Sequence, residues 1–519
     1  MREVADVKLL TGPEVCWKSS AVEEMALLVD GDIYYRAFVR AARRARRSIL
    51  LSGWQFDTEA QLLRGDERLP GADNTMLGFL NRLCAENPQL EIHILAWDYS
   101  LVYAVEREWM QGVKMALRSN DRIHFEYWAH PNSGGSHHHK YALIDDEVVF
   151  VGGLDICDSR WDTRAHAAHD ERRVDVSGEP YRPFHDIQLA LRGPVVADIR
   201  SIFQEFWSAV CERPAPEKVD RWEQAPSLRE LAEDGLPLRG NQVLLSRTLF
   251  REDQAPVAEV EALLRQAILA AESFVYVENQ YFTSLSILTA FRDRLSDAAR
   301  PPLTIVVVMP DGGDTPKEDF VLGNRQRSVR YALLKLAEAH GHRVRFLISS
   351  DHSSPEKPVS TFIHAKLMSV DDQLLCVGSA NLTNRSMRID SELTLTVQGE
   401  AGGNTSADIR AIVDSLLSEH AGLPDASRFQ DRSKLIETID ELCLGQNSKL
   451  QHLTVERCDD DDPMLTLIFD PSGELTTDNF GDALQAEVGC EDGIVRTIAR
   501  KAGQRLGVID VDKEKKAKS

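Results

Sequence analysis

The chain has 519 residues, of which 43% are hydrophobic and 27% are charged, and its formal net charge is −22. This length indicates two or three domains, and the acidic balance argues against a nucleic-acid-binding protein, which needs a basic surface. No apolar run approaches the roughly 20 residues that span a bilayer, and residues 1–20 lack the apolar core of a signal peptide. We therefore expect a cytoplasmic or peripherally membrane-associated protein, with secretion by a signal-less route left open.

The first half alternates segments with helical and with strand-like patterns. In chain order these are an amphipathic run at 33–45, apolar strands at 46–56, 90–98 and 122–125, the stretch "SHHHKYALID" at 136–145, and a return strand at 148–153. Strands that alternate with helices predict a sheet with helices on both faces. The acids that end the 136–145 stretch predict a hairpin turn.

The second half repeats this order. Its matching segments are 257–271, 271–281, 303–311, 343–346, 363–372 and 374–379, offset by 213 to 226 residues. We therefore expect an α/β protein of two duplicated mixed-sheet lobes related by a pseudo-twofold axis. The expected boundaries are a first lobe at 1–210, a linker rich in proline and charge at 211–240, a second lobe at 241–425, and a C-terminal extension of unknown role at 426–519.

A short motif occurs once in each half. His138 aligns with His364, Lys140 with Lys366, Asp145 with Asp371, and the pair Gly152-Gly153 with Gly378-Ser379. The alignment selects one histidine of the three in the first copy. Strand alternation places the histidine and the lysine of each copy on one face, while the aspartates fall at the turn and are expected to tie down the hairpin.

Two such motifs in one pocket would supply two imidazoles and two ammonium groups. Histidine suits nucleophilic and acid–base work near neutral pH, so one ring is expected to attack and the other to protonate the leaving group. Two lysines favour an anionic substrate whose transition state carries charge. A phosphate ester fits this arrangement best.

The doubled HxKxxxxD pattern, followed by GG or GS, resembles the phospholipase D superfamily over roughly residues 30–425. The stretches at 151–162, 184–199 and 276–282 are similar to phospholipase D enzymes of eukaryotic type. The resemblance implies the phospholipase D fold and a two-step phosphodiester transfer through a phosphohistidine, without metal or other cofactor.

The same resemblance implies the roles of individual residues. His138 would be the nucleophile and His364 the general acid and then base, with the motif aspartates Asp145 and Asp371 counted among the catalytic residues. The non-bridging phosphate oxygens would be held by Lys140, Lys366, Asn381 and Ser379. Asp155 occupies the position that matches Asn381, and we expect it to face away from the phosphate or to accept a hydrogen bond.

Each catalytic histidine also needs a carboxylate on its other ring nitrogen, which fixes the tautomer and the ring orientation. The segment "DIQLALRG" (186–193) matches "ELTLTVQG" (392–399), so Asp186 aligns with Glu392. We expect these two acids to orient the histidines.

No metal site is predicted. The runs "HHHK" and "HAAH" (166–169) suggest one at first sight, but a metal needs three or four converging ligands and no matching spacing occurs elsewhere. The eight cysteines form no CxxC pair.

The favoured function is a phospholipase D that acts at a membrane surface, releasing phosphatidic acid and a free alcohol, with transphosphatidylation as a side reaction. A cardiolipin-synthase-like phosphatidyltransferase is the main alternative. A phosphodiester nuclease is disfavoured by the charge, and an inactive scaffold by the two intact motifs. The sequence leaves the headgroup and the oligomeric state undetermined.

Overall fold

The computed structural model describes residues 10–457 together with residue 470. Within 10–457 the residues outside the description are 11, 99–107, 109–110, 133, 212–217, 220–221, 223–224, 252–254, 314–315, 355–356 and 446–447. In this part of the chain, no helix combines the length and the apolar composition needed to cross a bilayer. Of the extension expected at 426–519, most residues lie outside the described part.

The first half of the chain builds an eight-stranded sheet in the order β10-β2-β9-β7-β6-β3-β4-β5. Its strands are β2 (Glu24–Val29), β3 (Ser48–Gly53), β4 (Glu91–Trp97), β5 (Ile123–Trp128), β6 (Lys140–Ile144), β7 (Val148–Gly152), β9 (Ile187–Arg192) and β10 (Leu236–Pro237). The strands β3, β4 and β5 run parallel, and the other neighbours are antiparallel. The sheet is therefore mixed.

The second half repeats this strand order. Its sheet runs β1-β11-β20-β19-β18-β13-β14-β15-β16, with β12 and β21 added at the side. Its strands are β1 (Lys18–Ala21), β11 (Gln242–Leu249), β12 (Val257–Ala258), β13 (Phe274–Asn279), β14 (Thr304–Val308), β15 (Arg343–Asp351), β16 (Val359–Ser360), β18 (Lys366–Val370), β19 (Leu374–Gly378), β20 (Glu392–Gln398) and β21 (Leu450–His452). The expected fold of two duplicated mixed-sheet lobes is confirmed.

The edge strands are exchanged between the halves. Strand β1, near the start of the chain, pairs with β11 of the second sheet, whereas β10, from the expected linker, pairs with β2 of the first sheet. The lobes therefore do not coincide with the ranges 1–210 and 241–425 drawn from the sequence. An open sheet edge is completed by whichever segment can supply backbone hydrogen bonds, and the repeat pattern does not reveal which segment that is.

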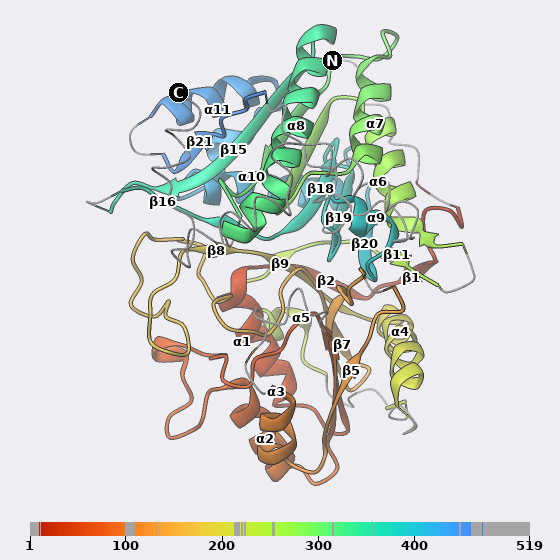
Figure 1. Cartoon of the computed structure of the whole chain (residues 1–519), viewed down its shortest axis with the longest axis vertical. Helices are drawn as coiled ribbons and strands as arrows, with labels where there is room; N and C mark the ends of the chain where they lie inside the picture. Colours follow the sequence, from red (N-terminus) through yellow and green to blue (C-terminus); the bar gives the residue numbers. More distant parts are fainter. Residues whose placement is uncertain are drawn as a thin grey trace, which may run out of the picture.

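Helices cover the outer face of each sheet, and two more helices lie between the sheets (Figure 1). The outer layers hold α1 (Asp30–Ala42), α2 (Met76–Glu86), α3 (Gln111–Arg118) and α5 (Leu228–Leu231) on the first half, and α6 (Glu259–Ala270), α7 (Leu285–Leu295) and α8 (Pro316–His340) on the second. Helices α4 (Val195–Val210) and α10 (Asn404–His420) contribute to one apolar core that includes strands of both sheets. This shared core holds the halves together.

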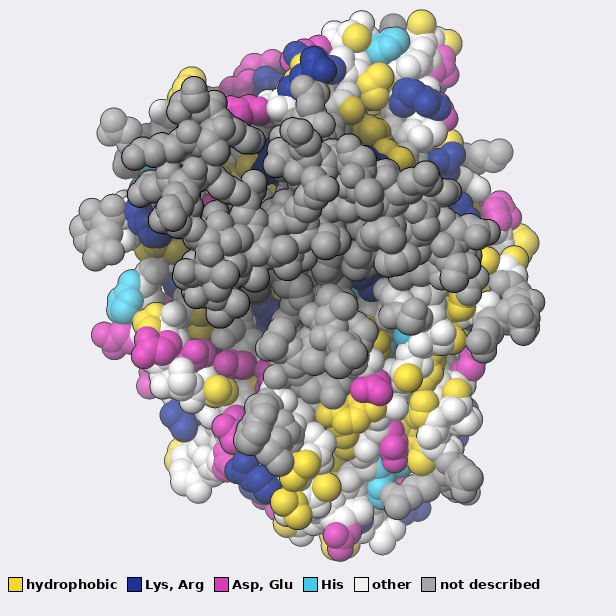
Figure 2. Space-filling model, in the orientation of Figure 1, with side chains coloured by type: hydrophobic (Ala, Val, Ile, Leu, Met, Phe, Trp, Pro, Cys, Tyr) yellow, Lys and Arg dark blue, Asp and Glu magenta, His cyan; other side chains and the backbone are white. Residues whose placement is uncertain are grey.

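Short elements complete the chain. They are α9 (Asn384–Arg388), α11 (Leu435–Leu444), and the 3₁₀ turns η1 (Gly65–Glu67), η2 (Ser427–Phe429) and η3 (Arg432–Lys434). On the face shown in Figure 2, acidic and basic side chains lie interspersed over the described surface.

A two-stranded parallel ribbon joins the halves directly. Strand β8 (Phe184–His185) pairs with β17 (Phe362–Ile363). The residue that follows β8 is Asp186 and the residue that follows β17 is His364. The ribbon therefore brings an acid of the first half next to the motif histidine of the second.

Candidate active site

Each motif lies on a hairpin, β6–β7 in the first half and β18–β19 in the second. The lysine is the first residue of its strand, and the histidine comes two residues earlier. Each ammonium group donates back to the carbonyl of its own histidine: Lys140 Nζ lies 3.1 Å from the His138 oxygen, and Lys366 makes the same contact with His364. The two side chains of a motif are thereby held on the same side of the hairpin.

The motif aspartates lie at the opposite end of the hairpins and hold the turns. Asp145 has φ 50° and Asp371 φ 53°, in the left-handed region. Asp145 accepts from the backbone N–H of Arg47 and Ser48, both at 2.8 Å. Asp371 accepts from the three consecutive N–H groups of residues 272–274. The oxygens of these acids therefore bind the starts of β3 and β13, and a catalytic role for either acid stays a prediction.

Each motif histidine contacts a carboxylate of the opposite half. His138 Nδ1 lies 3.0 Å from Glu392 Oε2, and His364 Nδ1 lies 2.6 Å from Asp186 Oδ2. Glu392 and Asp186 are fully buried. With Nδ1 engaged, Nε2 is the ring nitrogen left to meet a substrate. The sequence singled out these four residues but did not say which acid faces which histidine.

The charges of the two motifs act on one another. Burial lowers the pKa of His364 well below its usual value, and the charges of Lys366, Arg160, Lys140 and His138 lower it further. Burial also lowers the pKa of Lys366 to about 7, with a contribution from Lys140. Lys140 and His138 of the first motif therefore lie near enough to the second motif for their charges to act on His364.

The buried acid behind His364 is affected as well. Burial raises the pKa of Asp186 to about 6, although Lys366 and Lys140 work in the opposite direction. A carboxylate with this pKa, at 2.6 Å from Nδ1, is well suited to hold the imidazole in the tautomer that carries its proton on Nδ1.

The residues expected around the phosphate differ in how they are placed. Asn381 is 6% exposed, and its Oδ1 has no hydrogen-bond partner among the described residues. Ser379 is engaged elsewhere, because its hydroxyl donates to Glu392 and accepts from Leu393 N at 3.1 Å. Ser379 thus lies against the carboxylate that bonds His138, and phosphate binding by this residue stays a prediction.

Asp155 lies beside Lys140. Its Oδ2 is 3.1 Å from Lys140 Nζ, and its Oδ1 accepts from Trp54 N at 2.9 Å. The acid is thus held by two donors, as expected for a carboxylate that must not repel a phosphate.

The small residues at the end of each return strand allow backbones to approach closely. A Cβ at Gly152 would clash with the Ile187 carbonyl, and a Cβ at Gly378 with the Leu393 carbonyl. At Gly153 it would clash with the carboxylate of Asp186. Glycine at these positions is therefore what lets β9, β20 and Asp186 lie against the hairpins.

Two residues at the site were not assigned a role from the sequence. Gln280 Oε1 accepts from Lys366 Nζ at 3.2 Å. The guanidinium of Arg160 lies 4.8 Å from the ring centre of Phe184, which itself lies 5.3 Å from that of His364. Both residues fall in stretches that carried the family resemblance, 276–282 and 151–162, which was the only signal for them.

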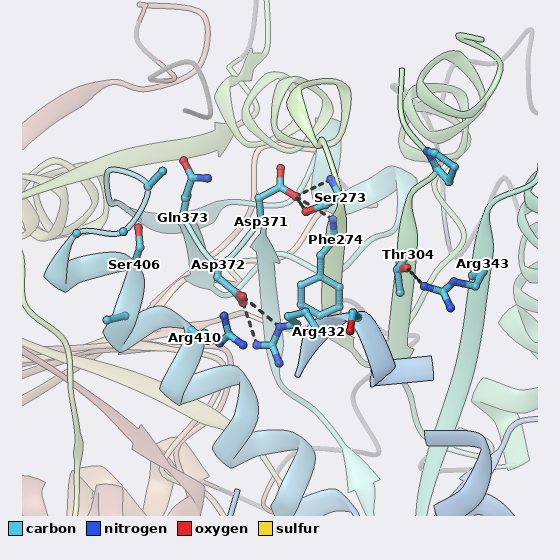
Figure 3. Close-up of a pocket in the computed structure, with 16 residues that line it drawn as sticks. Ser273, Phe274, Thr304, Arg343, Asp371, Asp372, Gln373, Ser406, Arg410 and Arg432 are labelled. Atoms are coloured by element: carbon cyan, nitrogen blue, oxygen red, sulfur yellow. Dashed lines mark hydrogen bonds and ion pairs between the residues drawn. The ribbon is translucent and has the colours of Figure 1, made fainter. Parts of the chain in front are cut away.

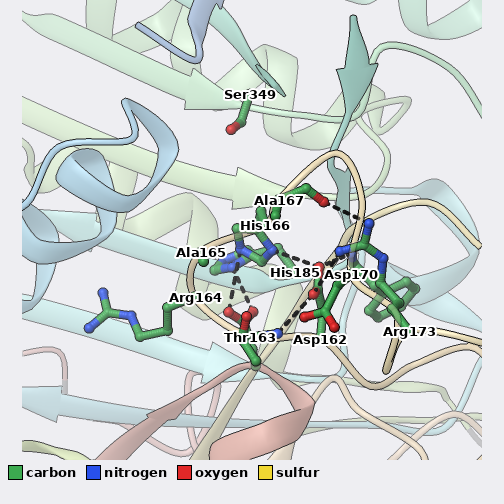
Figure 4. Close-up of polar contacts among 12 residues, drawn as sticks. Asp162, Thr163, Arg164, Ala165, His166, Ala167, Asp170, Arg173, His185 and Ser349 are labelled. Carbon is green, nitrogen blue, oxygen red and sulfur yellow. Dashed lines mark hydrogen bonds and ion pairs between the residues drawn. The ribbon is translucent and has the colours of Figure 1, made fainter. Parts of the chain in front are cut away.

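A buried polar network includes His166 and His185 (Figure 4), and His185 directly precedes Asp186 in the chain. Its centre is formed by His166, His185, Asp30 and Glu419, each of which offers one nitrogen or oxygen atom within 4.8 Å of those of the others. His185 Nδ1 is 3.0 Å from Asp30 Oδ1 and 2.9 Å from Glu419 Oε1, and His166 Nε2 is 3.0 Å from the same Glu419 atom. Burial opposes a charge on His166, but Asp30 and neighbouring carboxylates raise its pKa to about 9.

This donor set of two imidazoles and two carboxylates is one that could hold a divalent cation. The second nitrogen of each imidazole bonds a further carboxylate, His166 to Asp162 at 3.0 Å and His185 to Glu278 at 2.9 Å, as is usual for metal-binding histidines. The sequence pattern did not reveal the cluster, because its members come from four separate segments of both halves.

Comparisons with known proteins agree with the geometry. The family model described as "Phospholipase D" matches residues 41–300, half of the chain, and the model described as "Cardiolipin synthase, PLD-like domain" matches residues 264–417. Among solved structures, a phosphatidylserine synthase from Haemophilus influenzae Rd KW20 superposes with a TM-score of 0.53 at 13% identity. That match covers 82% of this chain and 94% of the synthase. The likeness concerns the fold.

Relatives of similar sequence carry phospholipase D names. Phospholipase D A of Dictyostelium discoideum is 25% identical over 445 residues, which is 72% of this chain and 33% of the relative. Phospholipase D alpha 1 of Ricinus communis is 23% identical over 528 residues, which is 76% of this chain and 64% of the relative. The chain thus spans between a third and just under two thirds of these relatives. Together with the doubled motif and the paired sheets, these matches show that the chain belongs to the phospholipase D superfamily.

Proposed function

We propose that the protein is a phospholipase D that cleaves the headgroup-side phosphodiester of glycerophospholipids at a membrane surface. The observation that carries the proposal is the pair of imidazoles, each hydrogen-bonded through Nδ1 to a buried carboxylate of the opposite half, with one lysine beside each. This arrangement supplies a nucleophile, a proton donor and two cations for one phosphate group.

In the first step, Nε2 of His138 attacks phosphorus and forms an N–P bond. The bond from phosphorus to the headgroup oxygen breaks, and His364 gives its proton to that oxygen. Its lowered pKa leaves His364 neutral in the free protein, so the imidazole must take up a proton from solvent when the substrate binds. A bound phosphate anion supplies the negative charge that raises the pKa of His364.

In the second step, water attacks the phosphohistidine while His364 takes up a proton from it. The N–P bond breaks, phosphatidic acid leaves and both imidazoles return to their starting states. Another alcohol can replace water, which gives transphosphatidylation. Lys140, Lys366 and Asn381 would hold the non-bridging oxygens throughout.

A phosphatidyltransferase is the second candidate. It is favoured by the match of residues 264–417, which include the second motif, to the cardiolipin synthase model. Its chemistry differs only in the acceptor, which would be a lipid alcohol rather than water.

The test is a headgroup-release assay on vesicles of phosphatidylcholine, phosphatidylethanolamine or phosphatidylglycerol, with and without a chelator. His138→Ala and His364→Ala should each lose several orders of magnitude in rate, while His340→Ala, at an exposed position, should match the unaltered protein. Phosphatidic acid as the product supports the phospholipase, and a condensed two-lipid product supports the transferase. Undiminished activity in either active-site variant would refute the mechanism.

Acid quenching during turnover should trap the intermediate. Peptide mapping is expected to find phosphate on His138. Phosphate on His364 would reverse the two roles while leaving the two-histidine mechanism in place.

A further inference from the structure

A cavity of about 580 Å³ lies beside the turn of the second hairpin (Figure 3). The turn residues Asp371 and Asp372 form part of its wall, at the opposite end of β18 from Lys366. The rest of the wall comes from the starts of β13, β14 and β15, the first turns of α10, and η3. The cavity is therefore separate from the candidate active site.

The duplication provides an internal comparison for this wall. The sequence Ala-Asp-Ile-Arg occurs at 197–200 in α4 and again at 407–410 in α10. In the first half, Arg200 forms an ion pair with the turn residue Asp146, and its Nη2 lies 3.2 Å from Ser48 Oγ. Arg200 of α4 thus contacts the hairpin turn of its own half directly.

In the first half, residues of the linker also contact the acids of the hairpin turn. Val219 N donates to Asp146 at 2.7 Å, and the indole nitrogen of Trp222 donates to Asp145 at 2.9 Å. Trp222 is 7% exposed. Helix arginine, turn acids and linker therefore form a closed contact there.

The second half is built differently at the equivalent point. Arg432 of η3 binds the carboxylate of Asp372. Its Nη2 and Nε lie 3.0 and 3.1 Å from the two carboxylate oxygens. Arg410, the counterpart of Arg200, instead donates to the backbone carbonyl of Gln430. Within the part of the chain that the structure describes, no carboxylate lies within ion-pair distance of Arg410. Its charge faces a cavity where the first half has a closed contact.

Arg410 acts electrostatically on Asp414 and Asp431, while both acids of the wall are bound by other donors. Asp371 accepts hydrogen bonds from the N–H groups at the start of β13. Asp372 forms an ion pair with Arg432. Arg343 adds a further guanidinium, whose partner Glu437 is 64% exposed. The N-cap residue of α10 is Gly403, which provides no side-chain cap, so the first N–H groups of the helix are not satisfied by a capping side chain.

We propose that this cavity binds a small molecule that carries a phosphomonoester group. Guanidinium groups bind phosphate oxygens with paired, charge-assisted hydrogen bonds, and an uncapped helix start adds backbone donors. Phe274, Pro302 and Ala407 give one wall an apolar character suited to a carbon skeleton. The volume lies in the range of small-ligand sites. This site goes beyond the proposed function and does not depend on it.

The phosphomonoester could belong to a soluble compound or to a lipid such as phosphatidic acid, and the experiment separates the two. Binding of glycerol 3-phosphate is measured by calorimetry, with glycerol as the neutral control. Vesicle co-sedimentation compares phosphatidylcholine with and without phosphatidic acid. Both use the full chain with Lys366→Met, which weakens phosphate binding at the candidate active site.

Binding of either phosphomonoester is expected in this background. Arg410→Gln should weaken it by about tenfold or more. Arg428→Gln, at an arginine outside the cavity that pairs with exposed Glu441, should leave it unchanged. Melting temperatures without ligand identify any variant that fails to fold, and Arg410→Lys then provides a milder second change.

The proposal is overturned if neither phosphomonoester binds, if glycerol binds equally well, or if Arg410→Gln binds as the parent does. It is also overturned if binding seen in the unaltered protein disappears with Lys366→Met alone, because the phosphate would then occupy only the active site. None of these outcomes bears on headgroup release by the unaltered protein.

Discussion

The imidazole of His138 is hydrogen-bonded to Glu392, a residue 254 positions further along the chain. The reciprocal pair, His364 and Asp186, is separated by 178 positions. Each half therefore contributes the histidine of one pair and the carboxylate of the other. Neither half contains a complete pair, so the chemistry depends on how the two sheets dock.

Removing the charge of an orienting acid should reduce turnover without loss of the fold. Glu392→Gln keeps the size of the side chain but can donate to Nδ1, which favours the wrong tautomer of His138. We expect kcat to fall by about 100-fold or more, with KM changed little, in a headgroup-release assay. Glu259→Gln, at a buried acid that pairs with Arg247 away from the site, is the control. Equal kcat in the two variants would contradict an orienting role.

The charge of Lys366 should set an alkaline limit to activity. Its pKa in the free protein is lowered to about 7, and the protonated form is the one that binds phosphate. We therefore expect kcat/KM to decline as the pH rises through about 7. The corresponding decline of kcat should occur at higher pH, because bound phosphate raises the pKa of the lysine. A decline of kcat and of kcat/KM at the same pH would argue against this assignment.

Lys366→Met should stabilise the protein while abolishing activity. The unfolded chain keeps this lysine charged up to about pH 10.5, whereas the folded chain loses the proton near pH 7. The cost of burying the charge is therefore fully present below pH 7 and shrinks as the pH rises toward 10.5. The gain in unfolding free energy should be larger at pH 6 than at pH 9 by about 3 kcal/mol, measured by denaturant titration. A gain independent of pH would contradict the lowered pKa.

Asp371 should matter for stability more than for chemistry. Asp371→Ala leaves three backbone N–H groups without their acceptor, which should cost about 3–5 kcal/mol of unfolding free energy. Asp371→Asn keeps one acceptor oxygen and should cost less. Per folded molecule, Asp371→Asn should retain kcat to within about tenfold, in contrast to His364→Ala. A folded but inactive Asp371→Asn protein would instead support a catalytic role for this acid.

A methyl group at Gly153 should disturb Asp186. The added Cβ would overlap its carboxylate, so Gly153→Ala should shift the acid away from His364 and lower kcat, with a smaller effect on KM. The matched control is Gly323→Ala in α8, where the nearest atom to a Cβ is 3.5 Å away. That change should raise stability by up to about 1 kcal/mol and leave kcat unaltered. Unchanged turnover in Gly153→Ala would show that the Asp186 contact tolerates displacement.

Much of the fold could be predicted because the evidence for it is local. Apolar runs such as 90–98 and 303–311 identify buried strands by their composition, and repetition of their order gave the two mixed sheets. The exchange of β1 and β10 could not be foreseen, since an edge strand is fixed by pairing with a distant segment. Those two short strands carry no repeat pattern of their own.

The sequence by itself determined the chemical groups: a doubled histidine and lysine, two aligned acids at 186 and 392, and acidic residues at two hairpin turns. These depend on neighbours within a few residues, which a repeat makes visible. The tertiary structure alone decided that each acid serves the histidine of the other half, that Ser379 faces Glu392, and that the second hairpin turn borders a cavity. Such contacts join residues that lie up to 254 positions apart and depend on how the two sheets pack. The spacing of residues along the chain does not reveal which of them will meet.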